Sequence, residues 1–352
     1  MSREKRFAAL EAAAVDRILI LDGGMGTQIQ GFNLEAADFE GERFANWEIP
    51  LKGNNDLLSI TRPDVIKAIH RQYTDAGADL IGTNTFSATT IAMADYKMEH
   101  LAAEIAREGA KIAREAADEA TDELGRQIGV LGSIGPTNKT LSLSPNVNDP
   151  GYRDVTFDEV RTAYYEQAEA MAPFVDFLLV ETVFDTLNAK AAIKALLDLQ
   201  AASGEVVPII LSGTITDASG RTLSGQTAEA FWASIRHAKP WAMGLNCALG
   251  AEMMRQYIAA LSKIADTRIL TYPNAGLPNA FGEYDETPEE FSGSLQEWGE
   301  SGLVNVIGGC CGTTPAHIAA VAEALKGKPA RKVPEAKPGM LLSGLEPFEL
   351  IG

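Results

Sequence analysis

Short apolar runs alternate with longer amphipathic stretches along most of the chain. Each run is rich in Val, Ile or Leu and precedes a loop that carries Gly, Asn, Thr or Pro. A continuous apolar run bounded by turn residues predicts a strand buried on both faces, whereas apolar spacings of three and four predict helices. Eight strands are predicted, at residues 17–22, 78–82, 127–133, 177–181, 207–215, 242–246, 268–272 and 304–308.

Eight helices are predicted between and after these strands. They lie at residues 63–76, 99–123, 157–171, 186–202, 228–238, 251–263, 287–301 and 315–326. Eight strand and helix pairs with continuous apolar strands favour a parallel sheet that is buried on both faces. We therefore expect an α/β fold, a (β/α)8 TIM barrel at residues 1–326. The rival fold is a doubly wound open sheet, which usually has fewer strands.

Three segments lie outside the repeated units. Residues 1–17 are expected to form a surface helix, because acidic residues interrupt their apolar part and no cleavage site follows. Residues 31–55 are too long for a simple connection, so they are expected to decorate the region between the first strand and the first helix. Residues 327–352 become rich in Pro and Lys and are expected to form a linker-like C-terminal tail with an apolar end.

Composition and charge narrow the class of protein. An apolar fraction of 46% and a charged fraction of 22% are globular averages, and 352 residues fit one barrel. A net charge of −18 without a Lys/Arg run disfavours nucleic acid and anionic lipid as partners. No stretch has the roughly 20 apolar residues of a membrane-spanning helix. Three cysteines cannot build a disulfide framework, so a reducing, cytoplasmic location is expected.

The three cysteines follow two of the predicted strands. Cys247 follows the sixth strand in GLNCALG, and Cys310 and Cys311 follow the eighth in GGCCGTTP. In a barrel these positions share the carboxyl-terminal face, which holds the active sites of this fold. Glycines around the pair let the backbone bend, so that both neighbouring sulfurs can turn toward one ion. The alternatives are burial as a small apolar residue for Cys247 and a strained disulfide for the pair.

Three thiolates on one centre favour a zinc ion. No histidine stands where it would complete the site, because all four lie within or at the start of predicted helices, where exposed or capping roles are expected. These are His70, His100, His237 and His317. Three protein ligands with an open fourth position are typical of catalytic zinc. Such an electron-rich ion is a poor source of hydroxide but can hold a substrate thiolate, so the cluster predicts thiol alkylation.

Other polar residues end strands on the same predicted face. Asp22 begins a glycine-rich turn after the first strand, and Glu181 ends the fourth. Glycine N–H groups can hold an amino-acid carboxylate, and the two acids can accept hydrogen bonds from its ammonium group. Thr83 and Asn84 are further substrate-binding candidates, with turn formation or packing as the alternative. The polar loop at residues 212–227 suits a pocket wall or a docking surface.

The strand-end motifs together resemble a known family. The motifs are DGGMGT, LKGNND, TNTF, GPTN, ETVFDTLNAK, SGTITDASGRTLSGQT, GLNCALG, PNAGLPNAFGEYD and GGCCGTTP. They are similar to the homocysteine-binding module of cobalamin-dependent methionine synthase, over residues 17–345. The chain is also similar, more distantly, to betaine- and S-methylmethionine-dependent homocysteine methyltransferases. Both resemblances imply a (β/α)8 barrel that binds zinc.

The resemblance implies roles for particular residues. The implied zinc ligands, which are also the catalytic residues, are Cys247, Cys310 and Cys311. The implied homocysteine contacts are Asp22, Gly23, Gly24 and Glu181. Asn274 in PNAG resembles the position that approaches zinc when the substrate is absent. Gly82 is a departure, because methionine synthases are expected to carry an acidic residue before TNTF.

The resemblance also implies a function. A zinc-bound homocysteine thiolate would accept a methyl group from methylcobalamin carried by a corrinoid-binding partner, forming methionine. The folate-binding module would be separate, because the chain stops where that module would start. The chain would then be a subunit of a split enzyme or an excised fragment.

Three alternatives stay open. The first is a self-contained methyltransferase that uses betaine or S-methylmethionine, and the second is a non-catalytic, zinc-dependent homocysteine-binding module of a larger complex. The third, a Schiff-base barrel, is disfavoured because no lysine ends a strand, although Lys139 lies in the third loop.

Overall fold

The computed structural model describes residues 1–216, 219–336 and 339–350. Two residues of the polar loop at 212–227 and four residues of the expected tail at 327–352 therefore lie outside the described residues. The division of the chain at residue 326 stays a prediction. None of the described helices has the length and apolar character to cross a bilayer.

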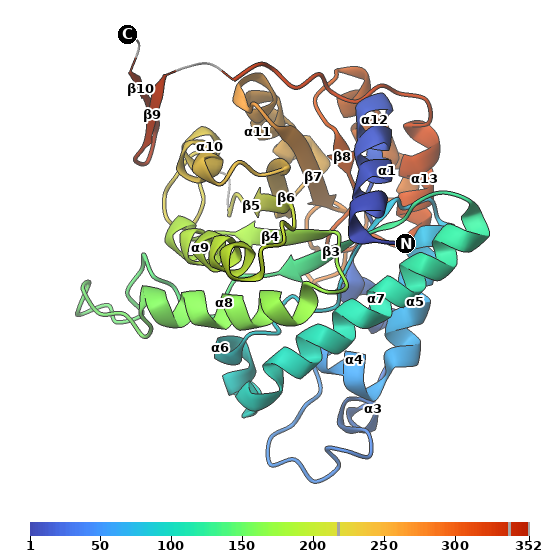
Figure 1. Ribbon diagram of the computed structural model, residues 1–352, viewed down its shortest axis with the longest axis vertical. Coiled ribbons are helices and arrows are strands. Elements are labelled where there is room, and N and C mark those ends of the chain that lie inside the picture. Colours follow the sequence, from blue (N-terminus) through green and yellow to red (C-terminus); the bar gives the residue numbers. More distant parts are fainter. Residues whose placement is uncertain (217–218, 337–338, 351–352) are drawn as a thin grey trace.

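Eight parallel strands form one sheet that closes into a barrel (Figure 1). The strand order is β1-β8-β7-β6-β5-β4-β3-β2, and a bridge between Leu21 and Leu80 joins the two ends. The strands are β1 (Leu19–Ile20), β2 (Leu80–Gly82), β3 (Gly129–Ile134), β4 (Phe177–Val183), β5 (Ile209–Gly213), β6 (Ala242–Gly250), β7 (Arg268–Asn274) and β8 (Val306–Ile307). The predicted (β/α)8 barrel is confirmed.

Eight main helices surround the barrel at the predicted places. They are α5 (Pro63–Asp75), α7 (Ala102–Leu124), α8 (Phe157–Met171), α9 (Thr186–Ser203), α10 (Ala228–Ile235), α11 (Ala251–Ile264), α12 (Pro288–Glu300) and α13 (Pro315–Ala324). The expected insertion at residues 31–55 contains α3 (Ala36–Glu40), and α2 (Met25–Gly31), η1 (Asn55–Leu57) and α4 (Leu58–Thr61) flank it. Further short elements are α6 (Thr90–Met93), η2 (Ala94–Tyr96), η3 (Glu99–Leu101) and η4 (Arg236–Ala238).

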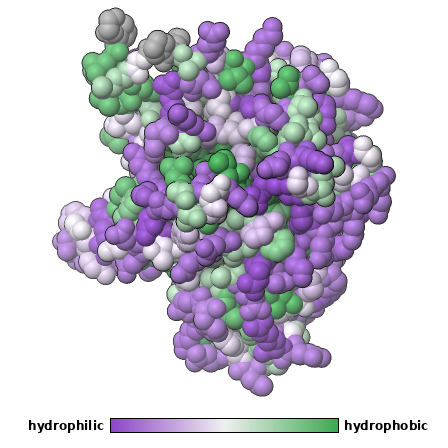
Figure 2. Space-filling model, in the orientation of Figure 1, coloured by the Kyte–Doolittle hydropathy of each residue, from purple (hydrophilic) through white to green (hydrophobic). Residues whose placement is uncertain are grey.

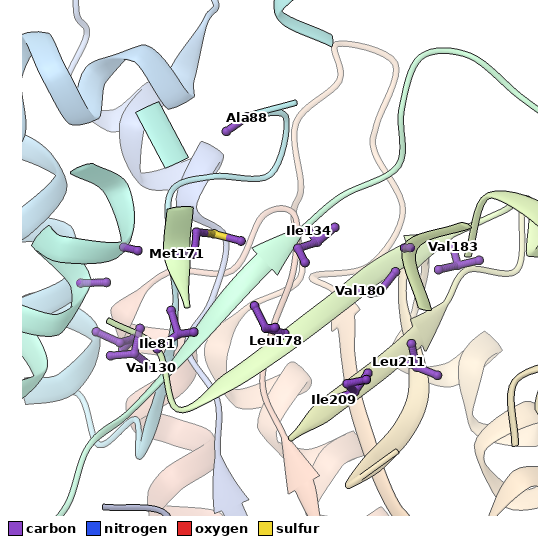
Figure 3. Packing of buried hydrophobic residues seen from close by; sticks show 14 of the residues in the cluster. Ile81, Ala88, Val130, Ile134, Met171, Leu178, Val180, Val183, Ile209 and Leu211 are labelled. Atoms are coloured by element: carbon purple, nitrogen blue, oxygen red, sulfur yellow. The ribbon is translucent and has the colours of Figure 1, made fainter. Parts of the chain in front are cut away.

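The apolar core has two layers because successive strand residues point to opposite faces. In β4, Phe177 and Leu179 belong to the cluster inside the barrel, whereas Leu178 and Val180 belong to the cluster between the sheet and the helices. Figure 3 shows part of this outer layer, in which strand residues pack with Met171 of α8. Burial on both faces explains why the strands read as continuous apolar runs.

The N-terminal helix α1 (Arg3–Asp16) lies at the surface, with one face packed against the inner cluster of the barrel. Leu10 and Ala14 belong to the inner cluster, and the ring of Phe7 lies 5.6 Å from that of Phe177. Arg6 donates to the fully buried Asp176 at 2.7 Å. The expected surface helix is thus present, and its buried residues recur on one face that covers strand residues of the inner cluster.

His70 differs from expectation. Its side chain is fully buried in α5, and neither ring nitrogen has a hydrogen-bond partner among the described residues. Burial lowers its pKa to about 4. The exposed or capping role was wrong here, because Ile66 and Tyr73 place position 70 on the buried face of the helix. His317 does cap its helix, since its Nδ1 lies 2.9 Å from Thr314 Oγ1.

The C-terminal segment ends in a hairpin of β9 (Met340–Ser343) and β10 (Pro347–Leu350). The hairpin lies against α10, and Gln226 of the polar loop donates to Ser343 Oγ (3.0 Å) and to Gly344 O (2.9 Å). Figure 2 shows apolar residues gathered at this hairpin on an otherwise largely polar face. The exposed apolar residues there are Met340, Leu342, Leu345, Phe348 and Leu350. The polar loop thus holds the hairpin.

Candidate active site

The structure brings the three cysteines together at the carboxyl-terminal mouth of the barrel. All three are free thiols, and their sulfurs lie within 4.8 Å of one another. The Sγ atoms of Cys247 and Cys311 are 3.8 Å apart, and those of Cys310 and Cys311 are 4.0 Å apart. A tetrahedral zinc ion with Zn–S bonds of about 2.3 Å spaces its sulfur ligands about 3.8 Å apart. The cluster therefore fits a zinc ion.

A distortion in β6 turns Cys247 toward the cluster. The strand was expected to end at Asn246, but it continues to Gly250, and its register with β7 shifts between those two residues. Within the shift, Cys247 and Ala248 have left-handed backbones with φ of +60° and +59°. Such a bulge redirects a side chain that regular pleating would point elsewhere.

The turn after β8 brings the other two sulfurs together. Gly309 N–H donates to Asp22 O at 3.0 Å, which ties this turn to the end of β1. Gly312 has a φ of +81°, a conformation that glycine adopts without strain. The expected bend at these glycines is thus present, and it lets the adjacent Cys310 and Cys311 face one point.

The charges of the thiols are strongly linked. Hydrogen bonds with Cys247 and Cys310 lower the pKa of Cys311, whereas hydrogen bonds with Cys247 and Cys311 raise the pKa of Cys310 well above its usual value. Burial and the neighbouring charges also oppose ionisation of Cys310. Ionisation of one thiol therefore opposes ionisation of its neighbours. A divalent cation would relieve that repulsion, which again fits a metal.

Asp22 and Glu181 lie beside the cysteines with their oxygens held in place. Asp22 Oδ2 accepts the Gly82 N–H at 2.8 Å. Glu181 accepts hydrogen bonds from Tyr272, at 2.9 Å, and from Ser133. The sequence placed both acids on this face, and the structure shows which neighbours fix their orientation.

Burial raises the pKa of both carboxyl groups. The pKa of Asp22 is well above its usual value because of burial, and the charge of Glu181 raises it further. The pKa of Glu181 is raised by burial, and the charge of Cys311 adds to this. An ammonium group between the two acids would favour their ionised forms. The pair is therefore suited to bind a cation.

The glycine turn after β1 is shaped by close packing. A Cβ at Gly23 would lie 2.7 Å from Thr313 Oγ1, and one at Gly24 would lie 2.7 Å from Cys310 O. The Gly24 N–H already donates to Thr313 Oγ1 at 3.0 Å. Within the described residues the Gly23 N–H donates no hydrogen bond. Of the two glycines, Gly23 is thus the one with a donor left for a substrate carboxylate.

Thr83 and Asn84 line the same cavity, but other residues occupy Thr83 Oγ1 and Asn84 Nδ2. Thr83 Oγ1 accepts the Ser133 N–H at 2.9 Å and lies 2.6 Å from Thr85 Oγ1. Asn84 Nδ2 donates to Asn55 O at 2.8 Å. These contacts favour a packing role, which was the alternative expectation for the two residues. Homocysteine binding by Thr83 and Asn84 stays a prediction.

Gly82 acts through its backbone. Its N–H is the group that Asp22 Oδ2 accepts, and a Cβ at this position would lie 3.9 Å from Asp22 Oδ1. An acidic side chain here would place a second carboxylate close to Asp22. Glycine at this position therefore adds no further negative charge beside Asp22.

Asn274 lies at the end of β7 next to the cysteine pair. Its side chain is buried, and its Oδ1 accepts the Cys311 N–H at 3.2 Å. The carboxamide thus contacts a cysteine of the cluster through the backbone. Approach of Asn274 to a metal in the substrate-free state stays a prediction.

A cavity of about 690 Å³ contains these groups. The acids that line it are Asp22, Asp56, Asp95 and Glu181, and its described lining includes no lysine or arginine. The cavity therefore favours a positively charged occupant. Lys139 is not among the described lining residues, and its Nζ lies 3.1 Å from Asp154 Oδ2. This placement disfavours a Schiff-base lysine.

Sequence reasoning missed several residues that support the site. Tyr272 and Ser133 orient Glu181, and Thr313 joins the glycine turn to the cysteine turn by donating to Cys310 O at 2.6 Å. A signal was present for each, because Ser133 and Tyr272 end predicted strands and Thr313 lies two residues after Cys311. Their position on the carboxyl-terminal face could have marked them as candidates.

Comparisons with known proteins agree with this architecture. A family model described as homocysteine S-methyltransferase matches residues 19–325. The metallated homocysteine methyltransferase MmuM from Escherichia coli is 23% identical, with a TM-score of 0.69, over 90% of this chain and 99% of that chain. Its apo form is 22% identical, with a TM-score of 0.63, over 91% and 99%. At these identities the likeness to the solved structures shows the fold.

Proposed function

Because the chain belongs to the homocysteine S-methyltransferase family, we propose that it methylates homocysteine to methionine with a zinc ion held by Cys247, Cys310 and Cys311. The observation that carries this proposal is the convergence of three free thiols beside two buried carboxyl groups in one acidic cavity. A dication and a substrate ammonium group would both complement that charge. The proposed substrate and metal therefore fit the same cavity.

The residues of the chain would bind and orient the substrate. Asp22 and Glu181 would accept hydrogen bonds from the ammonium group, and the Gly23 N–H would donate to the carboxylate. A zinc ion, when bound, would supply the positive charge that lowers the pKa of an incoming thiol and keeps its sulfur ionised. Once the ammonium and carboxylate groups of the substrate are held, only its sulfur remains to be aligned with the methyl group.

We further propose methylcobalamin on a corrinoid-binding partner as the methyl donor. The thiol would lose its proton, the sulfur would form a bond to the methyl carbon, and the carbon–cobalt bond would break with its electron pair left on cobalt. The motifs of the methionine synthase module support this donor. A folate with its carboxylates does not fit the acidic cavity, so the folate site would lie in a separate module. Cytoplasmic location stays a prediction.

The acidic lining also favours one alternative donor. A sulfonium such as S-methylmethionine is cationic, so the same cavity would attract it. Betaine carries one carboxylate and one quaternary ammonium group and has no net charge, so the acidic lining attracts it less than it attracts S-methylmethionine.

A donor comparison tests the proposal. Zinc-loaded protein is incubated with homocysteine and, separately, with methylcobalamin, S-methylmethionine or betaine, and methionine is measured. We expect methionine from methylcobalamin, together with a change of the absorption spectrum from that of methylcobalamin to that of cob(I)alamin. We expect no methionine from S-methylmethionine or betaine. Chelator-treated protein is the control. Methionine from S-methylmethionine alone would instead indicate a self-contained enzyme. Homocysteine binding without turnover, even with corrinoid-loaded carrier proteins, would indicate a non-catalytic module.

A further inference from the structure

The side chain of Asn246 connects three strands beneath the candidate active site. It is fully buried on β6, directly before Cys247. Its Oδ1 accepts the Thr182 N–H of β4 at 3.0 Å and the Ser212 hydroxyl of β5 at 2.7 Å. Its Nδ2 donates to Thr182 Oγ1 at 2.8 Å. One amide therefore makes three hydrogen bonds to two other strands.

Two neighbours of Asn246 have left-handed backbones: Thr182, to which its side chain is hydrogen-bonded, and Cys247, which follows it in the chain. Thr182 has a φ of +55° and Cys247 a φ of +60°. A left-handed conformation is costly for a residue other than glycine, and a β-branched residue such as threonine rarely adopts it. Such conformations persist where the surrounding contacts hold them. The Asn246 side chain is hydrogen-bonded to both the backbone N–H and the side-chain hydroxyl of Thr182.

Both strained residues belong to the candidate active site or adjoin it. Thr182 is next to Glu181, and Cys247 is one of the three clustered cysteines. Thr182 follows Glu181, and the register of β4 with β5 shifts between Val180 and Val183. Cys247 follows Asn246, inside the register shift of β6 with β7. The strands β4 and β6 are separated by β5 in the sheet, and the Asn246 amide joins the two distorted segments directly.

We propose that Asn246 is a positioning residue, which sets the carboxylate of Glu181 relative to the thiol of Cys247. This inference rests on the proposed function, in which Glu181 binds the substrate ammonium group and Cys247 helps to hold zinc. The amide keeps both bulges in one arrangement, and so fixes the spacing between the substrate's amino group and its sulfur. Residues that orient metal ligands typically contribute 10- to 100-fold to affinity or activity.

Asn305 offers a matched control at the other end of the barrel. Its side chain is also buried, its Oδ1 accepts the Ile269 N–H at 2.9 Å, and its Nδ2 donates to Arg331 O at 2.8 Å. Its backbone is not left-handed, and its partners lie away from the cavity lining. Loss of this amide should therefore cost stability without changing the site.

The test compares Asn246→Ala with Asn305→Ala in the zinc-loaded protein. The readouts are zinc stoichiometry, homocysteine affinity by calorimetry, and the thiolate-to-metal absorption of a cobalt-substituted sample with and without homocysteine. We expect both variants to lower the melting temperature. We expect only Asn246→Ala to weaken homocysteine binding, by about 10-fold or more, and to alter the cobalt spectrum. Ser212→Ala removes a single hydrogen bond to Asn246 and should weaken binding by about 3-fold.

The outcomes separate this inference from the proposed function. If the unchanged protein binds neither zinc nor homocysteine, the proposed function fails. If it binds both, but Asn246→Ala keeps the original affinity and cobalt spectrum, only the positioning role is overturned. The same conclusion follows if Asn305→Ala weakens homocysteine binding as strongly as Asn246→Ala. If Asn246→Ala does not fold, Ser212→Ala decides by the same readouts.

Discussion

Replacing Cys310 by serine is expected to remove bound zinc and to abolish methionine formation. Cys310 Sγ lies 4.0 Å from that of Cys311, and a hydroxyl is a far weaker zinc ligand than a thiolate. A structural zinc site with four ligands binds with about 10–16 kcal/mol, so one ligand accounts for about 3 kcal/mol. This corresponds to a loss of roughly 100-fold or more in zinc affinity.

Metal analysis, methionine assay and thermal unfolding together check this result. Zinc should raise the melting temperature of the unchanged protein, because a ligand that binds only the folded state stabilises it. It should leave that of Cys310→Ser unchanged. Chelator-treated protein is the matched control, since it retains all three thiols. A variant that makes methionine at the original rate without metal would contradict a metal role for the cluster.

Replacing Asp22 by asparagine is expected to weaken homocysteine binding while stabilising the protein near pH 7. Asparagine can still accept the Gly82 N–H, but it removes the charge that would bind the substrate ammonium group. A hydrogen bond to a charged group contributes about 1.5–3 kcal/mol, so the affinity should fall roughly 10- to 100-fold. Stability should rise because burial penalises the ionised carboxyl group and raises its pKa.

The pH dependence follows from the direction of that shift. A pKa raised in the folded state means that the folded protein binds this proton more tightly than the unfolded chain. The associated stability is present below the unfolded pKa of about 4 and is lost as the pH rises through the folded pKa. The free energy of unfolding of Asp22→Asn should therefore equal that of the unchanged protein near pH 3 and exceed it at pH 7.

Asp56→Asn is the matched control for this experiment. Asp56 is also a buried acid in the cavity lining, and burial raises its pKa to about 7. Asparagine at this position keeps an acceptor for the Ser87 N–H. It should raise stability at pH values above 7 and leave homocysteine affinity unchanged. Equal losses of affinity in the two variants, or none in Asp22→Asn, would contradict the substrate role of Asp22. Urea unfolding at several pH values and calorimetry give both quantities.

The sequence by itself determined the barrel and the face that carries the site. Strands buried on both faces must be continuously apolar, so their number and order could be counted. Parallel strands in a closed barrel all end on one face, which placed Asp22, Glu181 and the three cysteines together. These conclusions depend on local pattern and on a topological rule, and both are readable along the chain.

Only the tertiary structure decided how these groups are held. The amide of Asn246 reaches Thr182, 64 residues earlier, and the left-handed turn at Cys247 lies within a strand that local pattern ended too soon. The covered face of α1 and the burial of His70 likewise depend on which elements pack against them. Spacing along the chain cannot report side-chain contacts between distant strands or local backbone strain, because both are set by packing that exists only in the folded state.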